Sequence, residues 1–457
     1  LKQLIVQYEK PWKDEDGVQH AEQLRDSIFV FDLGGDLALF NFAQSTAAAF
    51  GRTFRFLSLE DHENWHYFNP FQSLAESDED RIIRIANLLI QAFHLDYGLI
   101  YGGSYYTQRH LSALLRVATR LRNSKGNSQS LNINDLLHYL QERSDRDEAE
   151  IRFAFQFLTE YTQLQPPPGS EDRQIDMRRA LDCGEVIYFL CPTMGEATTA
   201  RQIAGLGLYT LINAAMQRVR GRAEQDRLRP LPHAWVFVDE FQELAGRSFA
   251  ALLAQSSKFG ISLIMANQTT TQLKSRDLEL ADDVRDNTFA KIYFTVTGTD
   301  DIEALQAFSK EHRVGLGRKT ESFENLKLRM SEGEAEVILP LLSKDEILDT
   351  SSTHKHCFLV LDDGTGHKEP IRLKTAYAIE EQQYVKDKCT PPERRTEALP
   401  SKLDGKPGLP HRQAPRKDSS ESRRRLVLQE LLTVKIKQER PEEVEKMLLS
   451  PWQPTGL

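Results

Sequence analysis

The chain has 457 residues, enough for two or three domains that each bury a core, and a net charge of −9. Its composition, 40% apolar and 27% charged, is that of a globular protein, and no run approaches the roughly 20 apolar residues that span a bilayer. The four cysteines are scattered without a CxxC pair, which argues against a zinc site and a disulfide framework.

Continuous apolar runs predict the strands of a parallel sheet, because strands covered on both faces show no alternation. The four clearest runs are residues 28–32, 185–190, 234–239 and 262–266, and the shorter candidates are 53–57, 291–296 and 357–361. Helical patterns separate most of them, above all at 198–220 and 249–259. Strands that alternate with helices predict a doubly wound α/β core.

Between residues 81 and 181 the strand patterns stop and segments with a helical period follow one another. These segments are 81–94, 106–122, 133–142 and 148–164, and Pro166-Pro-Pro-Gly169 ends the last of them. We therefore expect an all-α domain at 81–181, inserted between two parts of the α/β core at 1–80 and 182–380.

The polar, proline-rich sequence of residues 381–457 predicts a disordered tail, because it carries too little apolar surface to form a core. Within the tail, 426–437 has the pattern of a short helix, a candidate docking element. The tail holds 16 Lys and Arg against 12 Asp and Glu, so the rest of the chain is the acidic part. An acidic body argues against indiscriminate DNA binding, and any nucleic-acid contact must then be local.

Two acids, Asp239 and Glu240, follow the apolar strand at 234–239. Ligands of open α/β sheets bind at the carboxyl ends of the strands. In a Walker B site the first acid holds Mg²⁺ and the second polarises the attacking water. The alternative is that the two acids only carry the end of the strand into solvent.

Two amides, Asn267 and Gln268, follow the next strand at 262–266. A neutral amide beside a Walker B strand senses the γ-phosphate or orients water without adding negative charge. The alternative is an amide that satisfies loop backbone. Suitable polar groups at the ends of both strands predict an ATPase architecture.

The strand at 28–32 runs into Asp32-Leu-Gly34-Gly35-Asp36, in which two glycines permit a tight turn. One interpretation is a further ligand-binding loop at the edge of the sheet. The other is a plain strand-to-helix turn in which Asp36 caps the next helix.

The order of these motifs resembles the conjugative DNA-transfer coupling proteins of the TraD/TraG type, within the FtsK/HerA-like group of RecA-fold motors. The stretches that carry the resemblance are 31–36, 67–71, 185–220, 238–241, 266–268 and 286–294, within a match over roughly residues 20–375. The resemblance implies a RecA-like P-loop NTPase core that uses ATP and Mg²⁺. It implies that Asp239 and Glu240 are the Walker B pair, with Asp239 on the metal, that Gln268 is the sensor, and that Asp32, Asp36 and Asn267 lie at the nucleotide.

The same resemblance implies a hexameric ring at the cytoplasmic face of the inner membrane, with DNA or a relaxase–DNA complex and type IV secretion components as partners. In the family, a membrane anchor and a GxxGxGK[ST] phosphate loop precede the point at which this chain begins. Neither pattern occurs here, and the first residue is Leu1. We therefore expect a truncated N-terminus and an incomplete site in the chain as given.

The chain departs from the family pattern at two places. Gly34 stands where the family usually has a lysine, and Lys258 stands where it tends to have an arginine that reaches a neighbouring subunit's nucleotide. Lysine lacks the bidentate fork of arginine, and Arg285 is a second candidate for this trans-acting cation. The alternative for both residues is an ordinary solvated charge.

The expected all-α domain carries a further candidate surface for DNA. Its basic side chains recur at near-helical spacing, with two tyrosines upstream: Tyr105, Tyr106, Arg109, Arg116, Arg120, Arg122 and Lys125. The alternative is the solvated face of an amphipathic helix.

Three functions are compatible with these features. The first is an ATP-driven translocation motor for DNA or nucleoprotein in conjugation or type IV secretion. The second is a non-catalytic recruitment module of the same fold, and the third is a HerA-like DNA-processing ATPase.

Overall fold

The computed structural model describes most of the chain between residues 12 and 392. The described residues are 12–13, 19–20, 25–59, 65–72, 78–95, 103–125, 132–141, 146–195, 197–222, 231–275, 278–296, 298–324, 327–353, 355–362, 369–376 and 379–392. The predicted helix at 426–437 and most of the predicted disordered tail therefore lie outside the described residues. Contacts divide the chain into two compact units, one built mainly on residues up to 284 and one on 285–378.

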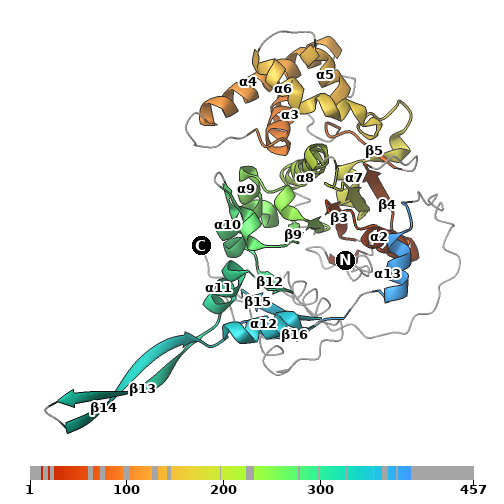
Figure 1. The fold of residues 1–457 in the computed structure, drawn as a ribbon. Coiled ribbons are helices and arrows are strands. Elements are labelled where there is room, and N and C mark those ends of the chain that lie inside the picture. Colours follow the sequence, from red (N-terminus) through yellow and green to blue (C-terminus); the bar gives the residue numbers. More distant parts are fainter. Residues whose placement is uncertain are drawn as a thin grey trace. The chain divides into compact units, whose positions relative to one another are not determined.

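A five-stranded parallel sheet forms the centre of the first unit, which confirms the predicted α/β fold class (Figure 1). Its spatial order is β4 (Phe54–Ser58), β7 (Val186–Leu190), β3 (Ser27–Asp32), β8 (Ala234–Asp239) and β9 (Ile261–Met265). Each strand lies within about a residue of its apolar run in the sequence. The reason is burial on both faces, which is complete along β3 and β7.

Helices cover both faces of this sheet, as the alternation of side chains along β7 shows. Tyr188 packs edge-on against Phe40 of α2 (Leu37–Ala49), with ring centroids 5.1 Å apart. Its neighbour Phe189 points the other way, toward Gly207 of α8 (Ala197–Arg220). A Cβ at residue 207 would lie 2.8 Å from the Phe189 ring, so glycine allows α8 to approach the sheet closely.

The remaining short elements of the first unit connect these layers. They are β1 (Trp12–Lys13), β2 (Gln19–His20), η3 (Glu171–Arg173), α7 (Met177–Cys183), η5 (Phe241–Glu243), α9 (Arg247–Gln255), η6 (Ser256–Phe259), η7 (Thr270–Leu273), β10 (Lys274–Ser275), β11 (Leu278–Glu279) and α10 (Leu280–Asn287), whose last residues belong to the second unit. The helix predicted at 249–259 is therefore α9 followed by a tighter turn.

In the described residues, the predicted helical insertion contains four helices and two short 3₁₀ turns up to residue 164. They are α3 (Asp78–Ala92), α4 (Gly103–Lys125), α5 (Ile133–Gln141), α6 (Arg146–Phe155), η1 (Gln156–Glu160) and η2 (Thr162–Leu164). Their apolar faces join the main core, and α3 packs along α8. The chain leaves the α/β layer through β5 (Tyr67–Phe68) and returns through β6 (Gln174–Ile175), and these two strands pair in parallel.

The second unit has an antiparallel sheet, which the sequence did not predict. Its strands are β12 (Ala290–Tyr293), β15 (His356–Leu361) and β16 (Ile371–Lys374), accompanied by α11 (Thr299–Phe308) and α12 (Lys344–Ser352). Two of the shorter apolar runs, 291–296 and 357–361, thus belong to this sheet and not to the parallel one. A long hairpin of β13 (Glu311–Glu324) and β14 (Lys327–Pro340) was also missed.

Part of the predicted disordered tail is folded. Residues Glu381–Lys388 form α13, which contacts α2. The side-chain amide of Asn41 on α2 donates to the carbonyl oxygens of Asp387 and Thr390, at 2.9 and 2.8 Å. These hydrogen bonds attach α13 to α2. The helix α13 is polar, and its sequence has no apolar stripe from which its packing could be predicted.

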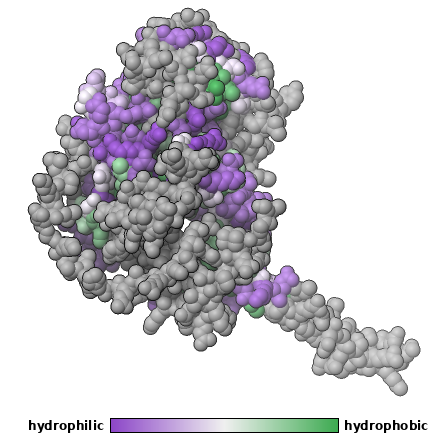
Figure 2. Space-filling view, turned by 180° about the vertical axis from the view of Figure 1, so that it is seen from behind, coloured by the Kyte–Doolittle hydropathy of each residue, from purple (hydrophilic) through white to green (hydrophobic). Residues whose placement is uncertain are grey.

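The described surface is largely polar on the side seen in Figure 2, where apolar colour is confined to small separate patches. Among the described residues, no helix combines the length and the apolar character that crossing a membrane requires.

Candidate functional site

The carboxyl ends of β3 and β8 bring two of the predicted site acids together. Asp32 and Asp239 are the last residues of these neighbouring parallel strands and are paired in register. The strand β9 runs beside β8, and the backbone N–H of Phe241 donates to the carbonyl of Ala266 at 2.9 Å. The loops that follow β3, β8 and β9 therefore meet at one edge of the sheet, as the sequence predicted.

Asp32 is fully buried, and both of its carboxylate oxygens are occupied. The Tyr188 hydroxyl donates to Oδ2 and the Gly35 N–H to Oδ1, each at 2.6 Å. Burial raises the pKa of Asp32, and it raises the pKa of Tyr188 well above its ordinary value, so Tyr188 remains the donor. We infer that Asp32 shapes the turn at 32–36. Asp36 caps α2 through the N–H of Ala38, which confirms the capping alternative for this residue.

Asp239 is half-buried and lies close to Gly34. A Cβ at residue 34 would lie 3.0 Å from Asp239 Oδ2 and 3.7 Å from Asp32 Oδ1. Burial raises the pKa of Asp239, and repulsion from Asp32, Glu240 and Asp36 raises it further. Residue 34 is a glycine and not the lysine that is usual in the family. It therefore adds no positive charge to the cluster of acids around Asp239.

Glu240 has a left-handed backbone, with φ 51° and ψ 48°, and its carboxylate is held by two amides. Gln268 Nε2 donates to Oε1 at 2.8 Å, and Gln242 Nε2 donates to Oε2. The predicted acid and the predicted sensor amide are therefore in direct contact. Gln242 is a site residue that sequence reasoning missed, because its contact depends on the left-handed turn at Glu240.

The strained turn at Glu240 is fixed by its surroundings. Phe241 is fully buried and packs on Phe249 of α9, with ring centroids 5.4 Å apart. Glu243, at the end of η5, pairs with Arg201 of α8. These contacts hold the turn from both sides, so Glu240 is presented in one orientation.

The structure places the other predicted site residues as follows. Asn267 is exposed beside Gln268. Lys258 lies in η6, before β9, and therefore at the opposite edge of the sheet from Glu240. Arg285 lies in the second unit, where its Nε is 3.1 Å from Asp286 Oδ1. The role in trans that the sequence suggested for Lys258 or Arg285 stays a prediction.

The acids at the sheet edge suit a magnesium ion that keeps most of its other ligands as water or phosphate. Among the described residues, no group of three or more His, Cys, Asp or Glu is arranged to enclose a metal. Mg²⁺ in nucleotide sites commonly uses only one or two carboxylates together with phosphate oxygens. Asp239 fits such a ligand, because it is only half-buried and its Oδ2 lies next to a residue without a side chain, Gly34.

The basic stripe of the helical insertion is partly structural. Arg116 and Arg120 of α4 lie 3.6 and 3.0 Å from the carboxylate of Glu148 on α6, which is 1% exposed. The side chains of Tyr105, Tyr106, Arg122 and Lys125 lie outside the described part of the chain. Two arginines of the predicted DNA-facing stripe therefore neutralise a buried acid.

Replacing Glu148 with alanine should lower the free energy of unfolding by about 2 kcal/mol, because it leaves two close, partly desolvated arginines without their acid. Urea denaturation followed by circular dichroism measures this change. Glu160→Ala is the matched control, since this exposed acid lies in the same insertion and should cost less than about 0.5 kcal/mol. Equal losses from the two variants would refute a structural role for Glu148.

Comparisons with known proteins place this geometry in context. The solved structures that resemble the chain include unbound TrwBdeltaN70, a bacterial conjugative coupling protein, at 13% identity and TM-score 0.46, covering 80% of this chain and 90% of that one. They include plasmid coupling protein TrwB in complex with ADP and Mg²⁺, at 13% identity and TM-score 0.47, with the same coverage. VirB4 of Thermoanaerobacter pseudethanolicus matches at 14% identity and TM-score 0.42, covering 81% of this chain and 97% of that one. The sequence has no significant match among curated proteins.

One family model covers more than half of the chain. It describes the type IV secretion-system coupling protein DNA-binding domain and matches residues 139–373, from the end of α5 to β16, which includes β7, β8 and β9 of the parallel sheet. This range contains Asp239, Glu240, Gln242 and Gln268. The chain therefore belongs to the family of type IV secretion-system coupling proteins.

Proposed function

We propose that the protein is an ATP-driven motor that moves DNA or a DNA–protein complex in conjugation or type IV secretion. The observation that carries the proposal is the contact between Gln268 and Glu240 beside Asp239, at the ends of adjacent parallel strands. Phosphoryl transfer at the carboxyl edge of a sheet requires one acid that binds the metal and a second acid that orients the water. It also requires an amide close to these acids.

In this proposal each residue has a distinct role. Glu240 accepts a hydrogen bond from the attacking water and orients it toward the γ-phosphate. Gln242 and Gln268 fix the Glu240 carboxylate, and Gln268 has a second amide hydrogen that can reach a phosphate oxygen. Asp32 holds the turn at 32–36 by accepting from the Gly35 N–H, and this turn places Gly34 next to Asp239.

Asp239 is the residue that would hold Mg²⁺, which supplies positive charge to the triphosphate when bound. The acids around Asp239 repel one another, and this repulsion supports a cation as their natural partner. The proposal also requires a phosphate-binding loop with its lysine, so the test must use the product of the complete gene.

The experiment is Mg²⁺-dependent ATP hydrolysis by that gene product and by its Glu240→Gln variant, with and without DNA. We expect the variant to bind ATP and to lose about 100-fold or more of the hydrolysis rate, because glutamine cannot accept the proton. Glu171→Gln, the same change at an exposed acid in η3, is the control that should keep the rate. Hydrolysis by Glu240→Gln at the unmutated rate would refute the motor.

Membership of a DNA-binding coupling-protein family supports DNA or a relaxase–DNA complex as the cargo and other type IV secretion components as partners. We propose a homohexameric ring at the cytoplasmic face of the inner membrane, with Lys258 or Arg285 as the cation offered to a neighbouring subunit. A heterologous interface that closes by rotation produces such a ring.

A recruitment module without nucleotide turnover is the second candidate, and Gly34 favours it. This glycine removes a cation from the acids at Asp239, which weakens the attraction of the site for a triphosphate. The hydrolysis assay separates the candidates, because a recruitment module would bind partners and show no hydrolysis for Glu240→Gln to abolish. A HerA-like DNA-processing ATPase would use the same residues and would hydrolyse ATP without secretion partners.

A further inference from the structure

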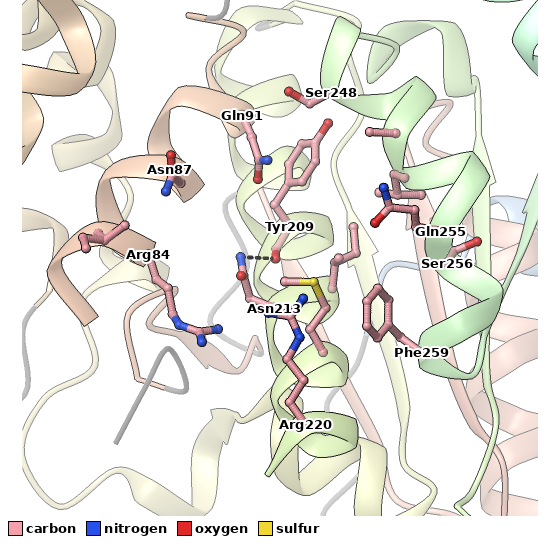
Figure 3. A pocket seen from close by; sticks show the side chains of 15 residues that line it. Arg84, Asn87, Gln91, Tyr209, Asn213, Arg220, Ser248, Gln255, Ser256 and Phe259 are labelled. Carbon is pink, nitrogen blue, oxygen red and sulfur yellow. Dashed lines mark hydrogen bonds between the residues drawn. The ribbon is translucent and has the colours of Figure 1, made fainter. Parts of the chain in front are cut away.

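A pocket of about 420 Å³ is formed by three helices of the first unit, α3, α8 and α9 (Figure 3). The C-terminal half of α8 forms its floor. One wall is α3 and the other is α9 with η6. This pocket is separate from the acid cluster. Arg220 and Phe259, which line it, lie at the amino edge of the sheet, about 30 Å along α8 from the edge that carries Asp239.

Positive charge in this pocket has no counterpart of opposite sign. Arg84 and Arg220 line it, no aspartate or glutamate does, and neither arginine has an ion pair with any described residue. The Arg220 guanidinium lies 6.0 Å from the centre of the Phe259 ring. In Figure 3 the Arg84 side chain extends from α3 and the Arg220 side chain from the C-terminal end of α8. In a chain of net charge −9, two uncompensated cations at one place favour an anion.

The rest of the pocket suits a planar polar group. Four carboxamides line it, and each offers both donors and acceptors: Asn87, Gln91, Asn213 and Gln255. The hydrogen bond drawn in Figure 3 joins Asn213 Nδ2 to the Tyr209 carbonyl at 3.0 Å, which leaves the Asn213 oxygen as an acceptor that this bond does not use. Donor and acceptor pairs are what the edges of nucleobases require, and the Phe259 ring provides a face for stacking.

We propose that this pocket binds one nucleotide unit, with its phosphate at Arg84 and Arg220 and its base among the carboxamides beside Phe259. The unit comes either from single-stranded DNA or from a free nucleotide. The DNA source rests on the proposed function, whereas the free-nucleotide source does not. Because the body of the chain is acidic, we expect nucleic-acid contact to be local. A single pocket that contains two arginines fits this expectation.

The test measures binding of two probes to the 457-residue chain: a short fluorescent oligothymidylate by anisotropy, and AMP by calorimetry. The double variant Arg84→Gln with Arg220→Gln should weaken probe binding about tenfold. For oligothymidylate it should also make the slope of log K against log salt concentration less steep by about 0.7, the value for one phosphate contact. The matched control is Lys386→Gln with Lys388→Gln on α13, which removes the same charge outside the pocket and should leave both quantities unchanged.

The two probes distinguish the sources. Oligothymidylate binding that depends on the arginines, without AMP binding, supports a DNA strand. AMP binding that is lost in the double variant supports a free nucleotide. If the double variant binds both probes as the unmutated chain does, or if neither probe binds, the proposal is overturned. Glu240→Gln must bind the probes normally, so failure of this site and failure of the hydrolysis site are separable.

Discussion

Asp239→Asn is expected to change activity and stability in opposite directions. In the complete gene product it should lower Mg²⁺-dependent ATP hydrolysis about 1000-fold, because the metal loses its charged protein ligand. Without nucleotide, the same change should raise the free energy of unfolding at pH 7 by about 1 kcal/mol. The reason is that burial and three neighbouring acids raise the pKa of Asp239, so its ionised form destabilises the fold.

The stability gain should depend on pH with a defined sign. A carboxyl whose pKa is raised by folding contributes stability that is fully present below its ordinary pKa of 3.8, and this stability is lost as pH rises through the raised value. The variant should therefore exceed the unmutated chain most at pH 7, and the difference should vanish as pH approaches 3.8. Urea denaturation at several pH values measures it, with Glu171→Gln, an exposed acid, as the control. A variant less stable than the unmutated chain at pH 7 would contradict the repulsion.

Gly184→Ala should destabilise the protein by about 3 kcal/mol. Gly184 ends α7 with φ +67°, and a Cβ there would lie 2.6 Å from both the Cβ and the carbonyl oxygen of Arg25. The left-handed backbone costs an alanine about 1 kcal/mol or more, and the forced backbone movement adds a similar or larger amount. Thermal and urea denaturation measure the loss.

Gly51→Ala separates the two causes. Gly51 has a similar φ of +61°, but no atom lies within 4 Å of its Cβ position. It should therefore cost only the backbone term, about 1 kcal/mol. If the two variants lose equal stability, the close approach of Arg25 to Gly184 is not a determinant of the fold.

Local patterns in the sequence were sufficient for the parallel sheet and for the meeting of its acids. The runs at 28–32 and 234–239 are continuous and apolar, so their burial and the position of Asp32 and Asp239 at the carboxyl edge followed from general rules of α/β sheets, whereas the pairing of these two strands did not. The contact of Glu240 with Gln268 also followed, since β8 and β9 are neighbours.

Features that depend on non-local contacts were not accessible in the same way. The hairpin of β13 and β14 is polar and lacks a clear alternation, so no pattern marked it. The antiparallel pairing of β12 with β15 joins segments about 70 residues apart in the chain, and an apolar run does not encode the direction of its partner. The folded helix α13 depends on hydrogen bonds from a single side chain, Asn41, more than 340 residues earlier.

The basic stripe shows why a pattern on one helix can mislead. Arg116 and Arg120 have the spacing of a nucleic-acid surface, yet the acid they neutralise lies on another helix, 28 residues beyond Arg120. Conversely, Arg84 and Arg220 are 136 residues apart and show no pattern, but the fold brings them to one pocket. Arg116 and Arg120 pair with an acid, whereas Arg84 and Arg220 have no ion pair with a described residue. This difference is visible only in the packing of the helices, such as that of α3 on α8.

The parallel pairing of β5 with β6 has a consequence for how such proteins diversify. Tyr67 and Phe68 face Gln174 and Ile175, so roughly a hundred residues depart from and rejoin the α/β layer at one small ladder. Closing a longer excursion between fixed ends costs only logarithmically more entropy. The four-helix segment can therefore lengthen, shorten or be replaced during evolution while the strands beneath it keep their register.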